Sequence, residues 1–163
     1  MRAVKPPTLT ASERAEKDAR DRAVGEARAA LADSVRRDRN LTARYPNEDA
    51  HARGREAALD TVRLAVKSTE LRLRELAAER KPLMEEVEFY KGRPLPPKLK
   101  AALDANDAAL EGRRSAVANQ ESEMGRINRL YDIELARLRS LWGGAQPGSL
   151  GPLPTASAVT PSR

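Results

Sequence analysis

The sequence predicts an all-α protein with a long antiparallel coiled-coil helical hairpin, preceded by a third, weakly amphipathic helix and flanked by disordered termini. Three observations predict this fold class. The 163 residues are 33% charged and only 3% aromatic, which is typical of long helices rather than of a round core. Apolar residues recur at heptad spacing, and Pro- and Gly-containing stretches separate the helical patterns.

The N-terminal part is predicted to be a disordered tail over residues 1–9 followed by a charged helix over residues 10–44. Thr10 and Glu13 fit a capping box, in which each side chain satisfies a backbone N–H of the first turn. The few apolar residues of this helix do not form a continuous stripe, so the helix has little surface to bury.

The hairpin is predicted to cover residues 47–142, with its turn at residues 91–97. Pro46 disfavours helix at the residue before it. Gly92 suits a left-handed helix end, and Pro97 suits the first position of the next helix. Residues 143–163 are rich in Pro, Gly and Ser and are predicted to be a disordered tail.

Heptad positions a and d in both hairpin helices define the predicted seam, because such a repeat is the signature of a coiled coil. In the second helix they are Leu59, Val62, Val66, Thr69, Leu73, Leu76, Arg80, Leu83, Val87 and Tyr90. In the third helix they are Leu99, Leu103, Asn106, Leu110, Arg113, Val117, Gln120, Met124, Ile127, Tyr131, Glu134, Leu138 and Leu141.

Polar seam residues predict the register of the hairpin. One register places Arg80 beside Asn106 and Leu76 beside Leu110. The register shifted by one heptad would place Arg80 beside Arg113, where like charges repel. We therefore expect the first register, with the polar residues specifying the pairing.

Enzyme chemistry is not expected from this sequence, and we predict no catalytic, cofactor or metal site and no small-molecule substrate. The chain has no cysteine and a single histidine. His51 stands near a helix start and is expected to be structural and to face solvent. Glu85, Glu86 and Glu88 form the densest acidic cluster, but neighbouring residues of a helix point in different directions.

The hairpin tip is the first candidate contact surface. It comprises Phe89, Tyr90, Lys91, Arg93, Lys98 and Lys100. The tip could present a basic loop to an acidic partner, a phosphate backbone or a membrane headgroup. The interpretation that we favour is a well-capped turn that lysines keep soluble.

The hairpin base is the second candidate surface, for a partner protein or a second copy. It comprises Leu130, Leu135, Leu138, Leu141 and Trp142. This apolar stripe is wider than one seam requires, and exposed apolar patches usually mark contacts. We expect the first helix to cover it through Leu31, Val35 and Leu41; a second copy is the alternative. Leu64 and Leu71 are predicted to lie on the far side of the second helix.

Charge and hydropathy bear on partners and compartment. The net charge is +6, but it is distributed over mixed-sign helices and forms no concentrated basic stripe, so nucleic acid is not the favoured partner. No segment of the sequence resembles a secretion signal or a membrane span. The sequence as it stands is therefore predicted to be cytoplasmic.

Residues 36–142 resemble the helical region of a proteobacterial envelope-protein family. The matching stretches are RRDRNLTARYPNEDA, MEEVEFYKGRPLPPKLKAALDAND and INRLYDIELARLRSLW. Members of that family normally carry a secretion signal and a small N-terminal domain of unknown function, which this sequence lacks. The resemblance implies an envelope or periplasmic protein if the N-terminus is truncated, and it implies no catalytic residues.

The function predicted from these features is a non-enzymatic helical-hairpin scaffold or adaptor that acts through protein–protein contacts or self-association. The alternative is a binder of nucleic acid or an anionic surface, which would use the basic tip and the N-terminal helix.

Overall fold

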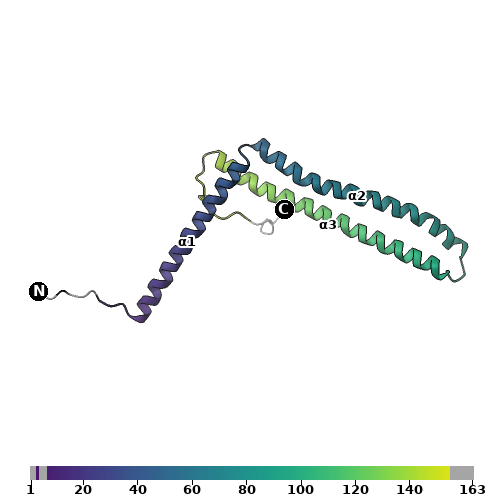
Figure 1. Cartoon of the computed structure of the whole chain (residues 1–163), viewed down its shortest axis with the longest axis horizontal. Helices are drawn as coiled ribbons and strands as arrows, with labels where there is room; N and C mark the ends of the chain where they lie inside the picture. The colour runs from purple at the N-terminus through teal and green to yellow at the C-terminus, as the bar shows by residue number, and fades with distance from the viewer. Residues whose placement is uncertain (1–2, 4–6, 155–163) are drawn as a thin grey trace, which may run out of the picture. The chain divides into compact units, whose positions relative to one another are not determined.

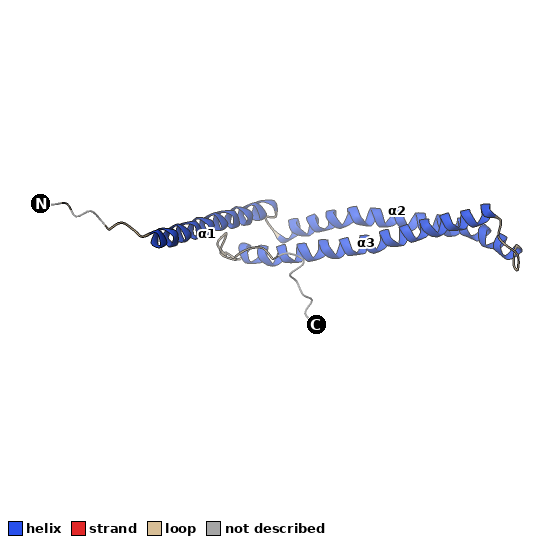
Figure 2. Cartoon of the chain, turned by 90° about the horizontal axis from the view of Figure 1, so that it is seen from below, coloured by secondary structure: helices blue, strands red, loops and turns tan. Residues whose placement is uncertain are grey.

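The computed structural model describes residues 3 and 7–154 and contains three helices, α1 (Ala11–Arg44), α2 (Glu48–Phe89) and α3 (Pro97–Trp142) (Figure 1). Within these residues Figure 2 shows helices and loops and no strand, so the predicted all-α class is confirmed. None of the described helices is long and apolar enough to cross a membrane.

The chain forms two compact units. Unit 1 contains α1 together with Ala136–Leu153, and unit 2 contains Asp49–Leu135. Unit 2 is the hairpin of α2 and α3, which run side by side in opposite directions in both Figure 1 and Figure 2. α3 is one continuous helix whose last residues belong to unit 1.

The helix ends follow the local signals in the sequence. The Thr10 hydroxyl accepts a hydrogen bond from the Glu13 backbone N–H at 3.2 Å, and the Glu13 carboxylate accepts one from the Thr10 N–H at 3.0 Å. Gly92 has a φ of 78°, which a residue with a side chain rarely adopts. Pro97 is the first residue of α3, as predicted.

The predicted heptad frame is confirmed in the hairpin. Every a and d position of α2 is buried or half-buried, with Leu59 and Leu76 exposing 4% and 2% of their surface. On α3, Arg113 is the only predicted seam residue that is exposed. Leu64 and Leu71, predicted to lie on the far side of α2, are exposed.

The polar contacts of the seam confirm the predicted register. The Arg80 guanidinium donates to Asn106 Oδ1 at 2.9 Å, and Asn106 Nδ2 donates to the Leu76 carbonyl at 3.0 Å. Gln120 Nε2 donates to the Thr69 hydroxyl at 3.0 Å. A pairing shifted by one heptad cannot make these bonds, so the polar residues specify one alignment of the two helices.

The expectation that His51 faces solvent is wrong. Its surface is only 1% exposed, and Nε2 lies 3.2 Å from Glu134 Oε1. The His51 ring also packs at 5.1 Å from the ring of Tyr131, whose hydroxyl donates to the Gly54 carbonyl. The antiparallel pairing brings the late turns of α3 over the start of α2 and thereby covers the imidazole.

Of the tail predicted to be disordered, residues 143–153 belong to unit 1, and residues 155–163 lie outside the described residues. The segment 143–153 is not helical, as its Gly and Pro content implies. It is nevertheless held in unit 1 by hydrogen bonds through the backbone of Gly148 and Gly151. Composition does not reveal these bonds, because backbone groups make them.

Candidate functional site

A buried ion pair joins the parts of unit 1. Asp38 of α1 and Arg137 of α3 expose 1% and 9% of their surface, and Arg137 Nε donates to Asp38 Oδ1 at 2.5 Å. The other carboxylate oxygen accepts from the Gly148 N–H at 2.8 Å, and Arg137 also donates to the Gly151 carbonyl. We call Asp38, Arg137, Gly148 and Gly151 the clasp, because their bonds connect α1, α3 and the C-terminal segment.

The charge of Asp38 is stabilised in this position. Burial opposes ionisation of the carboxyl group, but hydrogen bonds from Arg137 and Gly148 and the charges of Arg137 and Arg37 outweigh it. The pKa of Asp38 consequently lies below its ordinary value. The carboxylate is therefore ionised at neutral pH and fully engaged in structural bonds.

Gly148 of the C-terminal segment packs closely against α1. Its φ is 84°, and a Cβ added there would lie 2.6 Å from Val35 Cγ2 and 3.2 Å from Leu31 Cδ1. Only glycine fits this position without displacing α1 or the segment. Leu31 and Val35, which were expected to cover the hairpin base, thus lie next to Gly148.

The hairpin base is largely covered, and part of the cover comes from within unit 1. Leu138 and Leu141 are buried, and Trp142 Nε1 donates to the Tyr45 carbonyl at 3.0 Å. Leu130 and Leu135, which belong to unit 2, are half-buried. At the end of α3, Arg137 donates to Asp38 and Trp142 donates to the Tyr45 carbonyl. Leu31, which was predicted to cover the base, is 56% exposed.

The hairpin tip is a turn with internal partners. Arg93 lies over the rings of Phe89 and Tyr90 at 5.1 Å and 5.3 Å and donates to the Phe89 carbonyl at 2.6 Å. Lys91 lies 3.6 Å from the Glu88 carboxylate. Lys98 and Lys100 are exposed, as is Phe89 at 69%. The six predicted tip residues are neighbours, but two of their four cations already have local partners.

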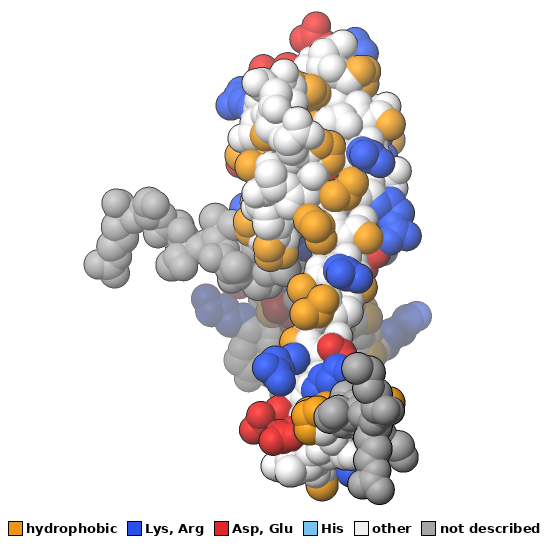
Figure 3. All heavy atoms as spheres, turned by 90° about the vertical axis from the view of Figure 1, so that its left-hand side faces the viewer, with side chains coloured by type: hydrophobic (Ala, Val, Ile, Leu, Met, Phe, Trp, Pro, Cys, Tyr) orange, Lys and Arg blue, Asp and Glu red, His pale blue; other side chains and the backbone are white. Residues whose placement is uncertain are grey.

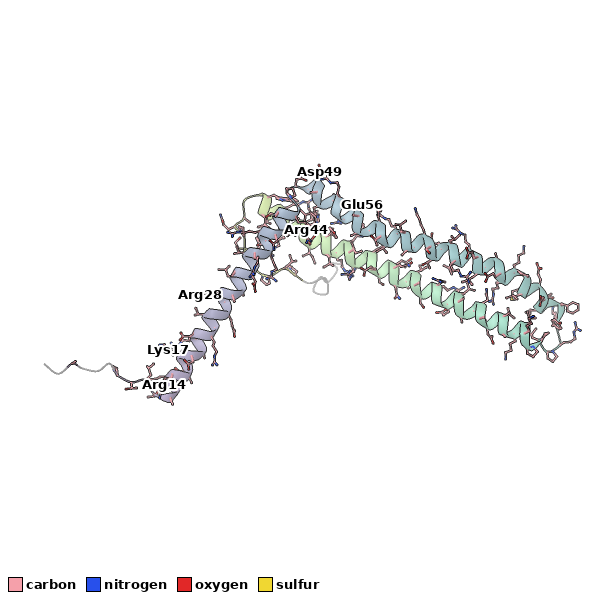
Figure 4. All side chains as sticks on the ribbon, viewed as in Figure 1. Arg14, Lys17, Arg28, Arg44, Asp49 and Glu56 are labelled. Atoms are coloured by element: carbon pink, nitrogen blue, oxygen red, sulfur yellow. The ribbon has the colours of Figure 1, made fainter. Side chains whose placement is uncertain are left out.

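The first two thirds of α1 form a long exposed helix, which the sequence suggested only as part of a surface for nucleic acid or another anionic partner. Every residue from Ala11 to Asp33 is exposed, including Val24 at 52%. Arg14, Lys17 and Arg28 project from this stretch in Figure 4. On the face of the molecule drawn in Figure 3, apolar side chains appear in small groups among charged and other polar atoms. The low amphipathicity of this helix can be seen in its sequence, and it indicates a helix that has little surface to bury within the chain.

Metal binding has no evident site in the described part of the chain. Across residues 3 and 7–154, no group of three or more His, Asp or Glu side chains is arranged so that it could hold a metal ion. The absence of catalytic and cofactor-binding residues stays a prediction.

Comparison with known proteins finds no similar protein. No family model matches the chain, and no curated protein and no solved structure gives a significant match. The resemblance to the envelope-protein family therefore stays a prediction.

Proposed function

We propose that this chain is a non-enzymatic helical adaptor or scaffold that acts through protein–protein contacts. The observation that carries the proposal is the exposed helix from Ala11 to Asp33. Helices in proteins draw most of their stability from packing of one face rather than from intrinsic propensity. The described residues leave this part of α1 largely uncovered, so we expect a partner protein to supply the missing contacts.

The hairpin supports a role as a spacer. At about 1.5 Å per residue, the paired stretch from Asp49 to Phe89 extends roughly 60 Å. The bonds of Arg80 and Gln120 across the seam oppose sliding of one helix along the other. Unit 2 is thus a rod of defined length, which is what a scaffold requires of a spacer.

A photo-cross-linking amino acid placed at Val24 in the full chain tests the proposal in cells that produce the protein. We expect a protein adduct of defined mass, which would be twice the chain mass if the partner is a second copy. The matched control is the same amino acid at Leu64, which is 67% exposed on α2. Equal labelling at both positions, or none at Val24, would contradict the proposal.

Binding of nucleic acid or an anionic surface is the second candidate, and Lys98 and Lys100 favour it. Both are exposed and form no ion pair with any described residue. Phosphate contacts predict that affinity for a generic duplex falls steeply as salt is raised. An affinity that is independent of salt, or no binding at low salt, would exclude this candidate.

The cell envelope is the compartment that the family resemblance suggests for this adaptor. Fractionation of cells that produce the full-length protein would test this. Recovery in the cytoplasmic fraction alone would exclude an envelope location.

A further inference from the structure

A small pocket lies beside the clasp in unit 1. It is lined by Arg37, Asp38, Asn40, Leu41, Arg44, Arg137 and Leu153 and has a volume of about 210 Å³. This space equals roughly seven water molecules at about 30 Å³ each and is smaller than a typical drug-sized site. The pocket therefore suits one amino-acid side chain with its attached polar group.

The net charge that a ligand meets in this pocket is positive. Asp38 does not offer a free anion, because Arg137 and the Gly148 N–H already occupy its carboxylate. Arg37 and Arg44 are exposed, and neither forms an ion pair among the described residues. Arg44 lies 5.9 Å from the Tyr45 ring, a contact that leaves its N–H groups available to an acceptor.

The geometry of α1 brings these polar groups to one face. Arg37, Asn40 and Arg44 are three and seven residues apart, so their side chains leave the helix on the same side. A guanidinium group binds a carboxylate through two parallel hydrogen bonds. Leu41 and Leu153 supply an apolar wall next to these donors.

We infer that this pocket binds the C-terminal residue of a partner peptide that ends in an apolar amino acid such as leucine. A terminal leucine carries a carboxylate and an apolar side chain on one residue. The carboxylate suits the guanidinium groups of Arg37 and Arg44, and the side chain suits the apolar wall. An internal Asp or Glu offers the carboxylate but leaves Leu41 and Leu153 without an apolar partner. The size of the pocket favours the single residue that carries both groups.

This inference goes beyond the proposed function, because it assigns a ligand class to a different part of α1. The exposed helix from Ala11 to Asp33 carries the proposed function, whereas the pocket begins at Arg37. Cross-linking from Val24 and peptide binding at the pocket can therefore fail independently.

The test is a titration of the full-length, ¹⁵N-labelled chain with acetylated Gly-Ser-Gly-Leu as the free acid, followed by NMR. We expect shifts at residues that line the pocket and a tenfold or greater loss of affinity when the peptide is amidated, because the amide removes the charge-assisted bonds to the guanidinium groups. An amidated peptide with an internal Asp before the Leu should also bind about tenfold more weakly.

Three variants locate the binding. Arg37→Ala and Arg44→Ala should each weaken binding of the free-acid peptide by about tenfold. Arg28→Ala is the matched control, because it removes one cation from the same helix outside the pocket and should leave the affinity unchanged. Far-UV circular dichroism of each variant verifies that the helices are intact.

Several results would overturn the inference. Equal binding of the acid and amide peptides would show that the carboxylate is not recognised. Equal binding of the internal-Asp peptide, or of inorganic phosphate in competition, would show a general anion site without a preference for a C-terminus. An absence of shifts up to the solubility limit of the peptide would show that the pocket does not take this ligand.

Discussion

Replacement of Asp38 by asparagine probes the clasp with the smallest change in shape. The asparagine amide would keep an oxygen that can accept from the Gly148 N–H but would lose the charge opposite Arg137. Arg137 is 9% exposed, so its guanidinium would remain buried without a counter-ion. The variant therefore isolates the electrostatic part of the contact.

The expected cost follows from these contacts. Removal of one partner of a buried ion pair typically costs about 3–5 kcal/mol. In Asp38→Asn the bond to Gly148 can persist, and Arg137 retains the Gly151 carbonyl as an acceptor. We therefore expect the lower end of that range, about 3 kcal/mol, in the free energy of unfolding of unit 1.

Trp142 provides the assay, because it is the only tryptophan and belongs to unit 1. Urea unfolding followed by Trp142 emission reports this unit, while far-UV circular dichroism reports all three helices. The matched control is Asp33→Asn, which removes an exposed carboxylate that pairs with Arg36 on the same helix. That change should cost at most about 0.5 kcal/mol, as exposed pairs contribute little.

Equal shifts of the Trp142 transition in Asp38→Asn and Asp33→Asn would refute this reasoning. A second check is the Asp38→Leu, Arg137→Met double variant. Because an apolar pair leaves no buried charge, it should be less destabilised than Asp38→Asn. A double variant that is less stable than the single one would show that the charges themselves, rather than the avoidance of an unpaired charge, hold unit 1 together.

Three further predictions concern the seam, the C-terminal segment and pH. Leu76→Ala should lower the free energy of unfolding by about 2–5 kcal/mol in urea denaturation followed by circular dichroism, whereas Leu71→Ala, at a position that is 53% exposed, should change it little. Gly148→Ala should destabilise unit 1 more than Gly151→Ala in unfolding followed by Trp142 emission. Both glycines have positive φ, but only at Gly148 would an added Cβ meet a side chain, at 2.6 Å. Equal effects of the two substitutions would exclude a steric role for Gly148. The pKa of Asp38 is lowered in the folded state. The contribution of its carboxylate to stability should therefore be complete above about pH 4, which is close to the pKa of an aspartate in an unfolded chain, and should decrease as the pH falls through the lower pKa of the folded state. Asp38→Asn should lack this part of the pH dependence, and parallel pH profiles would contradict the assignment.

Local and periodic signals explain why much of the fold could be predicted. The Thr10 capping box, the left-handed Gly92 and the initial Pro97 each act within a few residues, so their effects can be read directly from the sequence. The heptad repeat extends this to pairing, because a seam that must bury Leu76 and place Arg80 beside Asn106 allows one register.

The clasp could not be predicted in the same way. Asp38 and Arg137 are 99 residues apart and stand among many other charged residues of mixed-sign helices. Nothing in their local sequence distinguishes this pair from Asp33 and Arg36, which remain exposed. His51 is a similar case, because its burial depends on Glu134 and Tyr131 from the other hairpin helix.

The sequence by itself determined the three helices, their ends and the alignment of the hairpin, since local backbone preferences and the burial of an apolar stripe depend on residue type and spacing. Only the tertiary structure decided which charges are buried, where the segment after Trp142 lies and which residues line the pocket of Arg37 and Arg44. These features rest on backbone atoms of Gly148 and Gly151 and on groups distant in the chain. Such contacts leave no periodic pattern, because each is a single pairing that exists only once the helices have packed.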